Sequence, residues 1–225
     1  MVALLPMKGN SERIPNKNIK MLNNKRLFYY VGDKLLKSSL FNSLIINTDS
    51  EKIADIANKR YGKWVKIIER PDNLLGDHIS MNEIIKHDIS VIGKNINFFQ
   101  THSTNPFLKI STIKKSVELF NVGYSQGKWD SVFSVNTLNA RLYDSQLNAI
   151  NHNPKILSRT QDLDVVYLEN SNFYVFSGNS FMNNNHRIGL NPKPYPMNMG
   201  SLESLDIDTP DEWLFAERFL KQNTK

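Results

Sequence analysis

The feature of this sequence that most constrains its fold is the alternation of short apolar runs with segments of helical spacing over residues 1–135. Short apolar runs bounded by polar residues predict buried strands, and apolar residues recurring every three or four positions predict helices. The expected strands are Val2–Met7, Ser43–Asn47, Trp64–Ile68, Asn97–Thr101 and Ser131–Val135. The expected helices are Leu27–Ser38, a helix capped by Asp49 or Ser50, Asn82–Val91 and Ile110–Phe120. This order predicts an α/β fold, with a mostly parallel sheet flanked by helices.

After residue 135 the pattern changes to a polar, Asn-rich stretch with weak periodicity, which we interpret as an excursion from the core. Regular patterns return at Asn172–Phe176 and Leu202–Ile207, and Asp211–Leu220 has the spacing of a final helix. The residues expected on its buried face are Leu214, Phe215, Phe219 and Leu220. We therefore expect a core of residues 1–135 and 166–225 and an excursion of residues 136–165.

Composition narrows the function classes. The chain has 225 residues, enough for one sizeable domain, and it has no Cys, which excludes disulfides, thiolate metal sites and a cysteine nucleophile. Its net charge of +6 suits an anionic partner, but the basic residues are mostly scattered rather than arranged as the basic stripe typical of nucleic-acid binding. The first eight residues form too short an apolar segment for a signal peptide, and no run approaches the ~20 residues of a membrane span. We expect a cytoplasmic protein with no nucleic-acid or membrane partner.

The loop after the first expected strand, Lys8–Asn18, is rich in charged and hydrogen-bonding side chains. In open α/β sheets, ligands bind beyond the carboxyl ends of the strands, where this loop begins. Gly9 allows close backbone approach to a phosphate, Ser11 can donate to its oxygens, and Arg13 and Lys17 supply the charge to hold a triphosphate. The loop is neither a P-loop nor a dinucleotide-binding fingerprint. Composition alone leaves open a solvated basic loop with a turn at Gly9.

Asp206 and Asp208 form an acidic pair separated by one residue. On a strand, positions i and i+2 point to one face, and two aligned carboxylates cost stability unless a cation or a hydrogen-bond donor offsets their repulsion. Mg²⁺ takes one or two carboxylates together with phosphate and water oxygens, so the pair predicts a Mg²⁺ (or Mn²⁺) site. Alternatively, Asp208 caps the final helix ahead of Thr209 and Pro210, which leaves Asp206 unexplained.

These segments resemble the motifs of the acylneuraminate cytidylyltransferase family, the CMP-sialic acid synthetases. Lys8–Asn18 is similar to the family's Arg-Gly-Gly/x-Ser-Lys-x-x-Pro-x-Lys-Asn signature, with Lys8 in place of Arg and Asn10 in place of a common Gly. Arg70–Asp77 resembles Arg-Pro-x-x-Leu-Ala-x-Asp, and Ser204–Trp213 resembles the family's Ser-x-Asp-Ile-Asp end motif. The resemblance therefore runs the length of the chain.

Two further segments resemble the family but depart from it. His102–Phe107 stands in the place of Gln-Pro-Thr-Ser-Pro-Leu, so that His102 replaces a Gln that lies by the acceptor sugar in the family. The stretch around Arg159 looks like Arg-x-Gln-Asp before the Asn-x-x-x-Tyr strand, here ending at Tyr174. A second Arg, frequent in the family near Tyr167, is replaced here by Leu168-Glu169, which indicates an unusual sugar or compensation by a Lys or Arg elsewhere, such as Arg141 or Arg187.

The resemblance implies a nucleotide-diphospho-sugar transferase-like fold and a homodimer in which the excursion reaches toward the partner. It implies a CTP-dependent enzyme that activates an acidic nine-carbon keto-sugar as its CMP-sugar and releases pyrophosphate. Another acidic keto-sugar (legionaminic, pseudaminic or deoxyoctulosonic) or a catalytically silent nucleotide-binding protein are the alternatives.

The resemblance also implies three groups of site residues. Catalysis would use Arg13, Lys17, Asp206 and Asp208, the last two as the metal ligands. Nucleotide binding would use Lys8, Gly9, Asn10, Ser11, Arg70 and Ser80. Sugar binding would use His102, Arg159 and Tyr174. A helix N-cap at Ser80 and a loop histidine without function at His102 are the structural alternatives.

Overall fold

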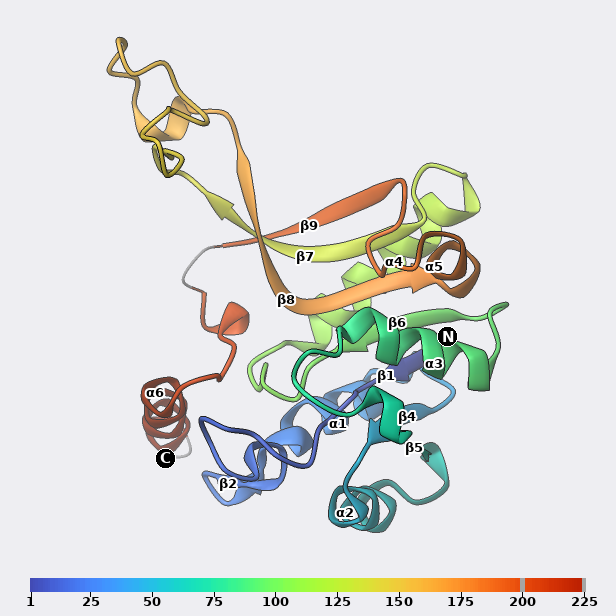
Figure 1. The fold of residues 1–225 in the computed structure, drawn as a ribbon. Helices are drawn as coiled ribbons and strands as arrows, with labels where there is room; N and C mark the ends of the chain where they lie inside the picture. Colours follow the sequence, from blue (N-terminus) through green and yellow to red (C-terminus); the bar gives the residue numbers. More distant parts are fainter. Residues whose placement is uncertain (199–200, 224–225) are drawn as a thin grey trace.

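The computed structural model describes residues 1–198 and 201–223, so residues 199, 200, 224 and 225 of the expected core lie outside it (Figure 1). A seven-stranded sheet has the order β5-β4-β1-β6-β8-β7-β9. Its strands are β1 (Val2–Leu4), β4 (Leu44–Thr48), β5 (Val65–Glu69), β6 (Asn97–Thr101), β7 (Ser131–Leu138), β8 (Val166–Ser177) and β9 (Pro192–Asn198). Only β8 runs antiparallel to its neighbours in the pairings found. The predicted α/β fold with a mostly parallel sheet is confirmed.

Helices cover both faces of the sheet (Figure 1). They are α1 (Leu27–Ser38), α2 (Glu51–Tyr61), α3 (Met81–Ile92), α4 (Ile110–Ser125), α5 (Gly178–Asn184) and α6 (Pro210–Gln222). Because side chains alternate along a strand, Phe99 packs with the α1, α2 and α4 residues of one core cluster, whereas Phe98 packs with the α3 and α5 residues of another. A small ladder of β2 (Met21–Leu22) and β3 (Lys25–Arg26) lies outside the main sheet.

Two predictions for the C-terminal segment are wrong. Leu202–Ile207 is not a strand: Leu202–Ser204 forms a 3₁₀ turn, and the next residues extend past the loop after β6, where Ile207 N donates to Thr104 O. Within residues 1–198 and 201–223, none of the sheet pairings includes this segment, so it joins no ladder there. Helix α6 buries Trp213 and Ala216, whereas Leu214 and Phe215 are exposed, because only a narrow face of α6 contacts a small apolar cluster.

The chain between β7 and β8 leaves the core (Figure 1, upper left). The two strands pair from Val135↔Glu169 to Leu138↔Val166, and this ladder leads into residues 139–165. Apolar side chains are exposed in or beside this segment, namely Leu147, Ile150, Ile156, Leu157 and Val165. The expected role of the excursion in dimerisation stays a prediction.

No helix in the described part of the chain combines the length and apolar character needed to cross a bilayer.

Candidate active site

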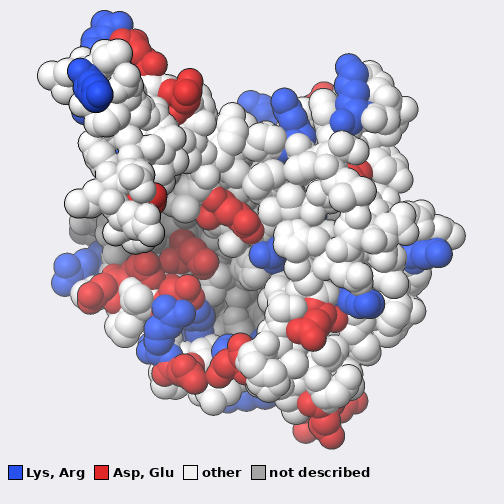
Figure 2. Space-filling model, turned by 45° about the horizontal axis from the view of Figure 1, so that its top comes forward, with Lys and Arg blue, Asp and Glu red and all other residues white. Residues whose placement is uncertain are grey.

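A cavity of about 430 Å³ lies at the carboxyl ends of β1 and β6. Its walls come from the loop after β1, the segment between β5 and α3, the loop after β6, Ser171 of β8, Arg187 after α5, and the segment that precedes α6. Figure 2 looks onto this hollowed side, where acidic and basic side chains gather close together. The predicted site residues that line the cavity are Lys8, Ser11, Arg13, Lys17, Arg70, His102, Asp206 and Asp208.

The loop after β1 is fixed in shape by buried hydrogen bonds. Asn18 Nδ2 donates to Lys8 O over 2.8 Å, and Ser103 Oγ donates to Asn18 Oδ1 over 2.5 Å. The Gly9 N–H donates to Asp49 Oδ1 over 2.6 Å, and a Cβ at Gly9 would lie 2.8 Å from Ser50 Cβ. Glycine is therefore required where the loop contacts the N-terminus of α2. This fixed loop presents its cationic side chains to the cavity.

The acidic pair faces that loop. Lys17 Nζ lies 2.8 Å from Asp208 Oδ1 and also donates to Ile207 O, and Arg13 Nη2 lies 3.5 Å from Asp208 Oδ2. Partial burial alone would raise the pKa of Asp208, but Lys17 and Arg13 outweigh it and hold that pKa below its usual range. The helix cap before α6 is Thr209, whose hydroxyl accepts from the Glu212 N–H, so Asp208 is free of a capping role.

Asp206 differs from its neighbour. Burial raises the pKa of its carboxyl group, although a hydrogen bond from Thr104 offsets part of this shift. Its Oδ1 is buried and has no hydrogen-bond partner among the residues that the structure describes. An orphaned carboxylate oxygen beside a second carboxylate fits Mg²⁺, which can bind through one or two carboxylates plus phosphate oxygens. Within residues 1–198 and 201–223, no group of three or more His, Asp or Glu forms a metal site by itself, so phosphate would have to complete the coordination.

The side chain of Arg70 is oriented by a series of buried hydrogen bonds to Asn47 and Asp88. Its Nε donates to Asn47 Oδ1 over 2.7 Å, and Asn47 Nδ2 donates to Asp88 Oδ1 over 2.7 Å. Asp88 is 1% exposed, and burial raises its pKa to about 7 despite the Asn47 hydrogen bond and the charge of Arg70. Arg70 is thereby oriented while its side chain lines the cavity.

The far wall of the cavity is polar and centres on Gln100. Its Oε1 accepts from Arg187 Nη1 over 2.9 Å, so its amide nitrogen faces His102 Nε2 at 3.0 Å and donates to it. Burial, together with the charge of Arg187, lowers the pKa of His102 to about 3. The imidazole is therefore neutral and carries its proton on Nδ1. His102 therefore adds no positive charge to this wall of the cavity.

A family model described as cytidylyltransferase matches residues 2–224. This chain belongs to the cytidylyltransferase family. It is 30% identical over 240 residues to a CMP-N,N'-diacetyllegionaminic acid synthase of Legionella pneumophila, covering 99% of this chain and 97% of the relative. It is 28% identical over 213 residues to an N-acylneuraminate cytidylyltransferase of Escherichia coli, covering 92% of this chain and 49% of that protein, about half its length. The resemblance to acylneuraminate cytidylyltransferases is confirmed.

A solved structure shows the same fold. A CMP:2-keto-3-deoxy-manno-octonic acid synthetase complexed with CTP matches with a TM-score of 0.72 at 11% identity, covering 99% of this chain and 98% of that one. This confirms the nucleotide-diphospho-sugar transferase-like fold. Family and fold together make this chain a nucleotidyltransferase.

Several predicted residues of this cytidylyltransferase do not line the cavity. Gly9 is half-buried and Asn10 is exposed outside the cavity, and Ser80 is exposed and caps α3 through a capping box with Glu83. Arg159 lies in the excursion, where it pairs with Asp162 over 2.7 Å and its side chain is 71% exposed. Their ligand roles stay predictions.

Tyr174 is fully buried and reaches the cavity only through its partners, because its hydroxyl accepts from Arg187 Nη2 over 3.0 Å and donates to Glu169. A β-bulge creates this arrangement. Phe133 of β7 pairs with Tyr174, and Val135, two positions on, pairs with Glu169, so β8 holds three extra residues. The bulge includes Ser171, which has a φ of 56° and lines the cavity.

Sequence reasoning missed Gln100, Ser171 and the full part played by Arg187. Gln100 ends a buried strand, and a buried polar residue at the carboxyl end of a parallel strand was the available signal. Asp77 was also missed as a partner, although it closes the Arg70–Asp77 motif: it pairs with Lys8 Nζ over 2.5 Å at the cavity rim. Ser171 had no local signal, because the bulge arises from pairing with a distant strand.

Proposed function

We propose that this cytidylyltransferase transfers CMP from CTP to the anomeric hydroxyl of an acidic nine-carbon keto-sugar of the sialic-acid type and releases pyrophosphate. The observation that carries the proposal is one cavity in which Arg13 and Lys17 face Asp206 and Asp208. The names of the relatives, a diacetyllegionaminic acid synthase and an N-acylneuraminate cytidylyltransferase, support an acidic sugar as the acceptor.

In the proposed reaction the sugar hydroxyl attacks the α-phosphorus of CTP and pyrophosphate leaves. The protein would contribute mainly positioning and charge stabilisation. Arg13 and Lys17 would bind the triphosphate and stabilise the departing pyrophosphate, with Lys8 in support. When CTP enters, its phosphates would compete with Asp208 for these two cations and so release that carboxylate.

We further propose that Asp206 and Asp208 hold Mg²⁺ (or Mn²⁺) together with the phosphates of CTP. The unpartnered Oδ1 of Asp206 supports this assignment, because a buried carboxylate oxygen without a donor is costly unless a cation reaches it. The bound ion would supply polarisation of the α-phosphate.

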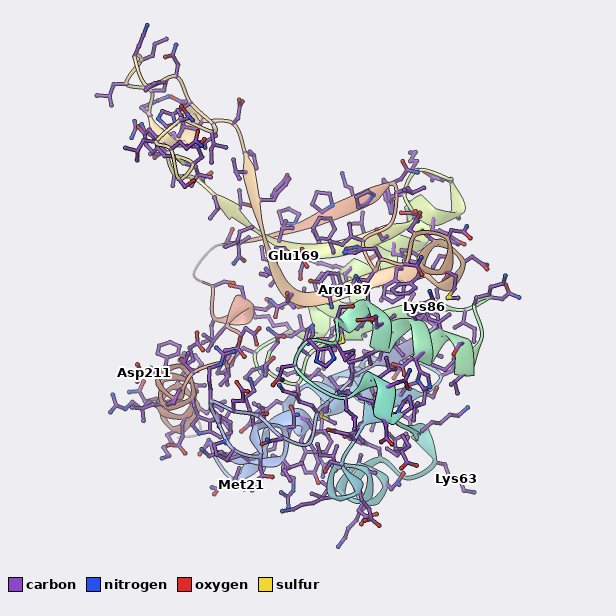
Figure 3. All side chains as sticks on the ribbon, in the orientation of Figure 1. Met21, Lys63, Lys86, Glu169, Arg187 and Asp211 are labelled. Carbon is purple, nitrogen blue, oxygen red and sulfur yellow. The ribbon has the colours of Figure 1, made fainter. Side chains whose placement is uncertain are left out.

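The test is pyrophosphate release from CTP and Mg²⁺ against a panel of eight- and nine-carbon acidic keto-sugars. Asp206→Asn is measured beside Asp211→Asn, which removes an exposed carboxylate from the first turn of α6 (labelled in Figure 3). We expect release with one sugar, its loss in Asp206→Asn, and its retention in Asp211→Asn. CTP binding without release for any sugar would favour the catalytically silent alternative and refute the proposal.

A further inference from the structure

Arg187 is an arginine buried in the wall of the cavity opposite the cationic loop. It follows α5, its side chain is 14% exposed, and it lines the cavity. The guanidinium carbon lies 3.7 Å from the centroid of the Tyr174 ring, so the two groups stack. Its backbone N–H donates to Asn82 Oδ1 over 3.4 Å. The side chain is thus held in one position by packing and by neutral hydrogen-bond partners.

The guanidinium is not satisfied by these partners. Of its five N–H donors, one reaches Gln100 Oε1 and one reaches the Tyr174 hydroxyl, both neutral acceptors. Glu169 Oε1 lies 3.7 Å from Nη2, beyond hydrogen-bond distance, and that carboxylate already accepts the Tyr174 hydroxyl. Figure 3 shows Glu169 and Arg187 near one another. Glu169 thus pairs with Arg187 electrostatically but takes none of its N–H donors, and the donors left without an acceptor among the described residues are available to a ligand.

The cations lining the cavity divide between two walls. Lys8, Arg13 and Lys17 belong to the loop after β1 and Arg70 follows β5, and all four lie on the proposed triphosphate side. Among the lining residues that the structure describes, Arg187 is the remaining cation, and it stands across the cavity beside His102 and Ser171. An acidic keto-sugar brings one carboxylate besides the phosphates of CTP.

We infer that Arg187 binds the carboxylate of the acidic sugar and thereby determines acceptor specificity; this inference rests on the proposed function. A planar guanidinium with two adjacent free donors suits a carboxylate. Arg187 then supplies the cation that the sequence lacks at Leu168-Glu169. Glu169 acts as the counter-charge of the empty site and competes with the entering carboxylate.

The test compares Arg187→Gln and Arg187→Lys with Arg218→Gln, which removes an exposed arginine from α6. Steady-state constants are measured for CTP and for the panel sugar that gives the fastest release, as the free acid and as its C1 methyl ester. Losing a charge-assisted hydrogen-bond pair should raise the sugar KM of Arg187→Gln about 10- to 100-fold. The KM for CTP should stay within about twofold of wild type. The sugar KM of Arg187→Lys should lie between that of wild type and that of Arg187→Gln.

The acid and the ester make the assignment specific. Wild type should prefer the acid, and Arg187→Gln should lose that preference, whereas a merely structural role of Arg187 would weaken both ligands equally. Glu169→Gln should lower the KM for the acid, because the competing charge is removed. If Arg187→Gln keeps the wild-type preference for the acid, the inference is wrong.

The proposed function and this inference fail in different ways. If wild type releases no pyrophosphate with any sugar, the proposed reaction fails, and binding of N-acetylneuraminic acid and its methyl ester to the CTP-loaded protein without a divalent ion is measured instead. Stronger binding of the acid that disappears in Arg187→Gln would still support the inference. Wild-type protein that binds the acid no better than the ester overturns it, whether or not the variants fold.

Discussion

The buried carboxyl group of Asp88 should make the stability of this protein fall as the pH rises from the ordinary pKa of an aspartate, 3.8, to about 7. Its pKa is about 7 in the folded protein, against an ordinary value of 3.8. Between these two values the folded state binds one more proton than the unfolded state, so the free energy of unfolding decreases with increasing pH, and the loss is complete above the folded pKa. Asp88→Asn keeps an oxygen acceptor for Asn47 Nδ2 and removes the titration.

The magnitude follows from the pKa. Within the range from pH 5 to pH 8, the free energy of unfolding falls only up to the folded pKa, which is about two pH units above pH 5. Each unit corresponds to about 1.36 kcal/mol, so the total loss is about 3 kcal/mol. The free energy of unfolding of Asp88→Asn, taken relative to that of wild type, should therefore rise by about 3 kcal/mol between pH 5 and pH 8. The absolute stability of either protein includes other titrating groups, which cancel in the difference.

The assay is urea unfolding of both proteins at pH 5, 6, 7 and 8. Arg70 faces Asp88 through Asn47 and stays charged throughout, and the imidazole of His87 is a close neighbour, with Nδ1 3.9 Å from Asp88 Oδ1. The comparison is therefore repeated in a His87→Gln background. A stability difference between wild type and Asp88→Asn that does not change with pH would refute the reasoning.

Three further predictions follow from the site and the excursion. Lys17→Met removes the closest cation of Asp208 and a triphosphate donor, so kcat/KM should fall about 10²- to 10³-fold in the pyrophosphate assay, and a fall under threefold would contradict the assigned role. Gly9→Ala places a Cβ 2.8 Å from Ser50 Cβ and should cost about 1–3 kcal/mol in urea unfolding and raise the KM for CTP; an unchanged transition would mean that the loop yields freely. Light scattering should find a dimer that Leu157→Asp weakens, because Leu157 is 91% exposed on the excursion; a monomeric wild type would rule this out.

The sequence predicted the sheet well because each buried strand is a short apolar run between polar segments. The strand at Asn97–Thr101 and the helix at Leu27–Ser38 have the predicted bounds, and α2 begins after the predicted cap Ser50. These elements are determined by local periodicity and capping. The cationic loop and Asp208 were likewise found, because charged residues gathered at one strand end need no long-range information.

Side-chain direction outside regular elements could not be predicted in the same way. Asp206 and Asp208 face the cavity, but not for the predicted reason, since no strand holds them and Lys17 and the loop after β6 do. Arg187 contacts Gln100, 87 residues away, and no local pattern marks that pair. Arg159 matched a motif but lies in the excursion. Its distance from the cavity depends on the length of the β7–β8 ladder, which the motif does not encode.

The three extra residues of the β8 bulge have a consequence for length variation. Side chains of a regular strand alternate between faces, so Glu169 and Tyr174, five positions apart, would otherwise point to opposite sides of the sheet. The odd number of inserted residues restores a shared face and allows the two side chains to touch. Deleting a single residue within Asn170–Asn172 would force β8 either to shorten the bulge or to slip by one position against β7, and the slip would turn Glu169 away from Arg187 and reverse the facing of the strand that leads into the excursion. This stretch should therefore tolerate substitutions of its side chains far better than a change of one residue in its length.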